Sequence, residues 1–126
     1  MTEEEINTFE KIEGQLESLH QEITNLSKKS QNDGLNKFKL KFVNKAISEA
    51  NSLLGQKYKP FDDFDLFDEN DIPSNSDVTM ILGQYLNCLE KLRSDNIIQE
   101  GVRWFWIAGK KTSSIRTSPP RKILEK

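Results

Sequence analysis

The chain has 126 residues, of which 35% are hydrophobic and 30% charged, with a net charge of −2 and one cysteine, Cys88. This length fits one domain, and a lone cysteine excludes an intramolecular disulfide. No apolar run approaches the roughly 20 residues of a membrane-spanning helix, so we expect a cytoplasmic protein without a membrane partner.

Charge is segregated along the sequence. Residues 1–30 carry a net charge of −4, residues 31–59 carry +4, residues 60–77 carry −7 and residues 101–126 carry +6. Blocks of this kind usually meet opposite charge within the fold or on a partner. We therefore expect the acidic block 60–77 to approach the basic block 101–126.

The N-terminal segment has the clearest periodicity. Six apolar residues alternate at spacings of three and four, which fills heptad positions a and d and predicts a helix over residues 3–29. This stripe has two interpretations: a seam against residues 35–54 in the same chain, or a coiled coil between chains. We favour self-association, with the candidate interface formed by Phe9, Ile12, Leu16, Leu19, Ile23 and Leu26.

A second amphipathic helix is predicted over residues 35–54. Its apolar residues are expected on one broad inward face, namely Leu35, Phe38, Phe42, Val43, Ala46, Ile47, Ala50, Leu53 and Leu54. The alternation of lysine and apolar residues over 37–42 is also typical of a strand, but the helical period continues for longer. Gly55 is a natural end for this helix.

Residues 60–77 form a linker in which phenylalanines recur every third residue among acidic side chains. The rings either pack into the core while the aspartates face water, or present an acidic, aromatic surface to a basic groove on a partner protein. The candidate partner-binding residues are Phe61, Phe64, Phe67, Asp62 and Asp65.

A third helix is predicted over residues 76–94, opened by a capping box of Ser74 and Asp77. From residue 97 the pattern changes to a β-hairpin, with a further polar strand over 112–117. The predicted fold is α+β and predominantly helical: an N-terminal heptad helix over residues 1–30, a small helical domain with the acidic linker and hairpin over 31–118, and a basic tail over 119–126. Pro119-Pro120 is expected to end the order, and the last six residues of this tail are expected to be frayed.

Catalytic and metal-binding chemistry finds little support in the sequence. His20 is the only histidine and lies in the middle of the heptad stripe, and Cys88 lies in a predicted helix, so no nucleophile–base pair is indicated. Two such residues cannot supply a zinc site, and the acidic linker lacks the glycine and distal glutamate of a calcium loop. We predict a non-enzymatic protein with no cofactor.

The C-terminal region interleaves bases with aromatic residues, a composition that suits contact with phosphates and stacked bases. The candidate nucleic-acid contacts are Arg103, Phe105, Lys110, Lys111 and Arg116. Trp104 and Trp106 lie two apart on the predicted strand and should share its inward face. The order of a helix, a short strand, a turn and an aromatic strand over 77–107 resembles the final half of a winged-helix domain.

Two functions follow from these patterns. The leading hypothesis is a protein-interaction or adaptor protein of unknown partner that forms homo-oligomers through its N-terminal helix. The alternative is a small winged-helix-like regulator that binds nucleic acid through its C-terminal hairpin.

Overall fold

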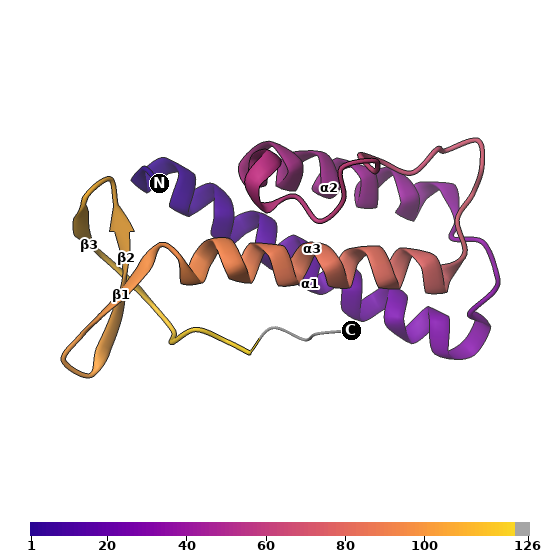
Figure 1. Ribbon diagram of the computed structural model, residues 1–126. Coiled ribbons are helices and arrows are strands. Elements are labelled where there is room, and N and C mark those ends of the chain that lie inside the picture. Colours follow the sequence, from indigo (N-terminus) through magenta and orange to yellow (C-terminus); the bar gives the residue numbers. More distant parts are fainter. Residues whose placement is uncertain (123–126) are drawn as a thin grey trace.

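The computed structural model describes residues 1–122 and contains three helices followed by one three-stranded sheet (Figure 1). The elements are α1 (Glu3–Ser30), α2 (Lys37–Tyr58), α3 (Asn75–Ser94), β1 (Ile97–Glu100), β2 (Arg103–Ala108) and β3 (Lys111–Thr117). This order confirms the predicted α+β, predominantly helical fold with a C-terminal hairpin, and β3 corresponds to the further polar strand predicted over 112–117.

Polar side chains cap the start of each helix. Thr2 forms a full capping box with Glu5, Asn36 accepts from the backbone of Lys39, and Ser74 accepts from the backbone of Asp77. Each cap satisfies a backbone N–H that has no partner inside the helix. The cap predicted at Ser74 is confirmed.

Gly55 interrupts α2, although the helix extends to Tyr58. Its φ angle of 63° lies in the left-handed region, which glycine adopts without steric cost. The predicted end of the regular helix at Leu54 is therefore correct, and residues beyond Gly55 form a short additional turn.

The hydrophobic core lies where the three helices meet. α3 packs against both α1 and α2, and in Figure 1 it crosses the centre of the molecule. Its inward side chains Val78, Leu82, Tyr85 and Leu89 are fully buried. Within residues 1–122, none of the three helices is long and apolar enough to cross a membrane.

The sheet closes one end of the helical core. Its strands are antiparallel in the order β1-β2-β3, and Trp106 of β2 packs edge-on against Phe9 of α1 with ring centroids 5.0 Å apart. Trp104 also packs against the core, which confirms that the two tryptophans share the inward face. The Gly109 backbone N–H donates to the Met1 carbonyl at 2.8 Å and joins the β2–β3 turn to the N-terminus.

The segment after β3 is held against α3 as far as Arg121, which corrects the prediction that the order ends at Pro119-Pro120. The Arg93 guanidinium is 2% exposed and makes a bidentate pair with Glu90, at 2.8 and 2.9 Å. It also donates to the Thr117 hydroxyl and to the carbonyls of Ser118 and Pro119, each at 2.8 Å. All five N–H donors of the guanidinium are thereby satisfied. The part of the predicted tail over 123–126 lies outside the described residues.

Arg121 extends this attachment to α1. Its backbone N–H donates to Glu90 at 2.7 Å, and its guanidinium pairs with Glu17 at 3.2 Å and Glu13 at 3.7 Å. The basic C-terminal segment therefore meets the acidic face of α1, where we had expected it to meet residues 60–77.

Candidate functional site

The heptad stripe of α1 is buried within a single chain. Phe9, Ile12, Leu16 and Ile23 are at most 1% exposed, while Leu19 and Leu26 are half-buried against the same core. Side chains already enclosed by α3 and the sheet are not available to a second helix. The assignment of Phe9, Ile12, Leu16 and Ile23 to an interface between chains is therefore corrected in favour of the intramolecular seam, to which α3 contributes more than α2. Leu19 and Leu26 keep part of their surface exposed.

Two phenylalanines of α2 that are predicted to face the core are exposed in the structure. Phe38 is 72% exposed and Phe42 is 42% exposed, and their rings contact each other edge-on with centroids 5.0 Å apart. They are one helical turn apart, so they form a single apolar ridge on the outside of the molecule. Large apolar surfaces exposed in this way usually mark interaction sites.

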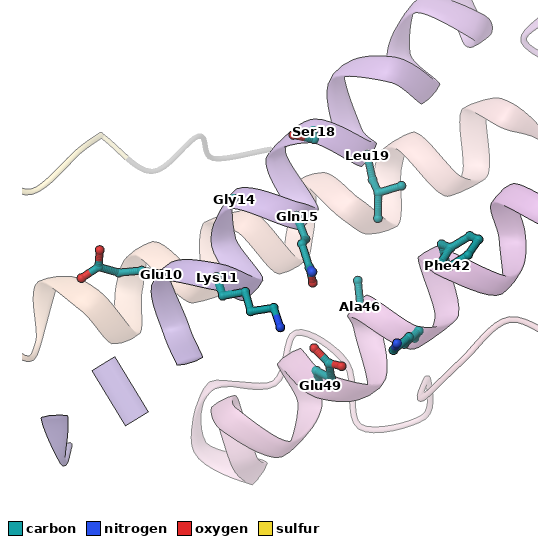
Figure 2. Close-up of a pocket in the computed structure, with 10 residues that line it drawn as sticks. Glu10, Lys11, Gly14, Gln15, Ser18, Leu19, Phe42, Ala46 and Glu49 are labelled. Carbon is teal, nitrogen blue, oxygen red and sulfur yellow. The ribbon is translucent and has the colours of Figure 1, made fainter. Parts of the chain in front are cut away.

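A groove of about 660 Å³ runs between α1 and α2 and ends at this ridge. Figure 2 shows Leu19 and Gln15 of α1 facing Phe42 and Ala46 of α2 across the groove. The remaining lining residues are Glu10, Lys11, Gly14, Ser18, Lys45 and Glu49. A smaller hollow shares Glu49 and continues the groove toward Thr8 and Leu53.

The ridge carries unneutralised positive charge. Lys37, Lys41 and Lys45 are exposed beside it, and within residues 1–122 none of the three has a carboxylate within 4.0 Å. Lys39, by contrast, forms an ion pair with Glu22 of α1 at 3.1 Å, which joins the two helices. From here on, the name α2 ridge covers both the two phenylalanines and the three lysines beside them: Phe38, Phe42, Lys37, Lys41 and Lys45.

The acidic linker is fastened to the fold by its backbone. The Asn44 side chain exchanges two hydrogen bonds with the backbone of Phe67, at 2.9 and 3.0 Å. Asn51 donates to the Asp65 carbonyl at 3.0 Å and accepts from the Tyr85 hydroxyl at 2.6 Å. The linker is thereby held on the surface of α2.

The aromatic rings of the linker pack inward. Phe61, Phe64 and Phe67 are half-buried against the core, and the last two are in edge-on contact at 5.0 Å. Asp62 remains exposed, and the Asp65 carboxylate pairs with Lys59. The rings are therefore not presented to a partner, and the linker offers mainly its carboxylates to solvent.

The outer face of the sheet brings together several of the predicted nucleic-acid residues. Phe105 lies beside Ile98 of β1 and Arg116 of β3, on the face opposite the buried Trp106. Arg103 is exposed on the same face but lies beside Glu100 in the strand register. The remaining two predicted contacts, Lys110 and Lys111, are exposed at the β2–β3 turn.

Burial shifts the pKa of several titratable side chains on the helices. Burial lowers the pKa of His20, which lines a hollow of about 360 Å³ between α1 and α3 together with Met80 and Gly83. Burial raises the pKa of the Cys88 thiol and raises that of Tyr85 to about 12. Each shift follows from desolvation and favours the uncharged form. Within the described chain, no three His, Cys, Asp or Glu side chains converge to hold a metal ion.

The winged-helix resemblance extends to the order α3, β1, β2 over residues 77–107. A helix that enters the major groove must expose one face. Most residues of α3 are buried or half-buried, and its C-terminal half is occupied by the Arg93 attachment. Contact with nucleic acid would therefore fall to the sheet.

Comparisons with protein-family models, with curated proteins and with solved structures gave no match.

Neither the groove nor the polar contacts that position the linker and the C-terminal segment are predicted from the sequence. The lysines over 37–45 could have indicated the ridge. Because lysines usually face solvent, phenylalanines that lie between them are expected near the surface and not in the core. No local pattern identifies Arg93, whose acceptors lie 24 to 26 residues further along the chain.

Proposed function

We propose that this protein is a non-enzymatic interaction module that binds a partner protein through the groove between α1 and α2. The observation that carries the proposal is the exposed Phe38–Phe42 pair at the end of this groove. An unsupported aromatic pair beside a concave surface supplies the apolar anchor that interaction sites require.

Self-association stays a prediction, but the buried stripe does not support a coiled coil as its route. Light scattering at tens of micromolar measures the mass directly. If a dimer is found, Phe38→Ser is expected to dissociate it only if the α2 ridge forms the contact.

Affinity capture from the native host tests the proposal, using the wild type, Phe38→Ser and the matched control Met80→Ser. Met80 is also an exposed apolar residue on a helix, but it lies on α3, away from the groove. We expect a protein that the wild type and Met80→Ser capture equally and that Phe38→Ser loses. Equal capture by all three chains would contradict the proposal.

A second candidate function is the binding of nucleic acid by the outer face of the sheet. The adjacent Phe105 and Arg116 support it, because a ring beside a guanidinium can stack a base and contact its phosphate. Fluorescence anisotropy with labelled single- and double-stranded DNA and RNA at 50 and 200 mM salt is the test.

Under the second candidate, neutralising Lys110, Lys111 and Arg116 together should lower the slope of log affinity against log salt by roughly two to three units. Phe105→Ala should weaken binding without unfolding the protein. Absence of binding by the wild type at 50 mM salt would eliminate this candidate.

A further inference from the structure

We infer that the partner segment received by the α1–α2 groove is an acidic amphipathic helix. This inference rests on the function proposed above and adds the chemistry of the partner. It follows from three properties of the surface: its length, its apolar floor and the sign of its uncompensated charge.

The length of the surface suits a helix. Along α2 the groove and ridge extend from Phe38 to Leu53, which corresponds to about 22 Å at the helical rise per residue. A partner helix of about 16 residues would cover this distance in roughly four turns.

The floor of the groove suits apolar side chains spaced by one helical turn. Leu19, Phe42 and Ala46 line its centre, and Phe38 extends the apolar surface beyond it. A helix that places apolar residues at i, i+3, i+4 and i+7 can rest these side chains in such a groove.

The charge of the surface selects an acidic partner. At the ridge, Lys37, Lys41 and Lys45 are exposed, and none of them has a carboxylate within 4.0 Å among residues 1–122, whereas the far end of the groove mixes Lys11 with Glu10 and Glu49. Complementary charge steers association and fixes orientation. The acidic residues of the partner are therefore expected at the end that lies over Phe38.

An anionic membrane would also attract exposed phenylalanines among lysines. The concave shape of the site favours a helix instead, because a bilayer surface cannot fill a groove between two helices. We therefore treat membrane binding as an outcome that the experiment must be able to detect.

The test uses the full chain and a displayed library of peptides of about 16 residues. The apolar positions of the library are fixed at helical spacing, and the other positions are drawn from Glu, Lys, Gln and Ser. We expect the wild type to enrich acidic peptides, and Phe38→Ser to weaken their binding by roughly tenfold or more. Met80→Ser should bind as the wild type does. Circular dichroism checks that each variant is folded.

A charge exchange makes the test specific. Lys41→Glu with Lys45→Glu should reduce binding of the enriched peptides by roughly tenfold, and peptides with lysine in place of glutamate should restore it. The matched control is Lys111→Glu, which changes an exposed lysine on β3 and should have no effect.

Each remaining outcome contradicts the inference in a recognisable way. Enriched peptides that depend on Phe38 but are neutral or basic would overturn the acidic partner and leave the proposed function standing. Absence of any peptide that depends on Phe38 would overturn both. Phe38-dependent binding to vesicles of phosphatidylcholine and phosphatidylserine, without peptide enrichment, would replace the helix by a membrane surface. A dimer that Phe38→Ser dissociates would replace it by a second copy of this chain.

Discussion

Replacing Arg93 with methionine is expected to destabilise the protein strongly. The substitution keeps an extended side chain but removes all five hydrogen bonds of the guanidinium. Glu90 is 6% exposed and, among residues 1–122, would keep the backbone N–H of Arg121 as its one remaining hydrogen-bond partner. Removing one member of a buried ion pair costs about 3–5 kcal/mol, because the other charge stays buried without compensation.

This cost is large compared with the whole stability of a domain, which is about 5–15 kcal/mol. Urea unfolding followed by circular dichroism measures it. With a denaturant dependence of about 2 kcal/mol/M, the midpoint should fall by roughly 2 M. The matched control Arg103→Met removes an exposed arginine from β2 and should change stability by no more than about 0.5 kcal/mol.

The double variant Arg93→Met with Glu90→Leu separates the ion pair from simple packing. Because neither charge remains, its destabilisation should be clearly smaller than the sum of the two single effects. Strictly additive effects, or a loss below about 1 kcal/mol for Arg93→Met, would show that the pair does not hold the C-terminal segment as argued.

Four further predictions follow from burial and backbone geometry. Leu16→Asp should unfold the chain in urea titrations, because it places an unpaired charge in the core; a folded monomer would instead restore the interchain interpretation. Burial lowers the pKa of His20 in the folded chain, so below about pH 6.5 the unfolded chain binds more protons than the folded chain does. The free energy of unfolding should therefore decline as the pH falls below this value, and His20→Gln should remove this pH dependence. Burial raises the pKa of Cys88, so at pH 8 a thiol reagent should react more slowly with the native chain than with the urea-unfolded chain; equal rates would contradict this. Gly14→Ala should raise the free energy of unfolding by about 1 kcal/mol, because the added methyl meets no atom within 4 Å; a loss of stability in thermal melts would refute it.

The helices and strands could largely be predicted because their signals are local. The a and d spacing of α1, the glycine at position 55 and the cap at Ser74 each report on residues within two turns of one another. The alternation around Trp104 and Trp106 likewise identified the inward face of β2. These features depend on the backbone period, which the sequence carries directly.

The exposed surfaces could not be predicted in the same way, because they depend on which distant segments of the chain pack against each helix. The helical period places Phe38 and Leu40 on one helix but does not say how wide an arc the other helices cover. In the fold, Leu40 is completely buried and Phe38 is exposed. The inward rings of the acidic linker depend on Asn44, whose partner Phe67 is 23 residues away.

Three features that are unusual on a protein surface lie at the groove between α1 and α2. Phe38 is an aromatic residue that stays 72% exposed. The ridge lysines have no carboxylate within 4.0 Å among the described residues, and Gly14 weakens the interior of a long helix. Each one costs stability or solubility if the chain acts alone. Natural sequences accept such inconsistencies chiefly at functional sites, where another requirement outweighs local stability. Core packing does not explain why these three features occur on one surface, because none of them contributes to the core. A binding groove with an aromatic anchor and a basic rim requires this combination.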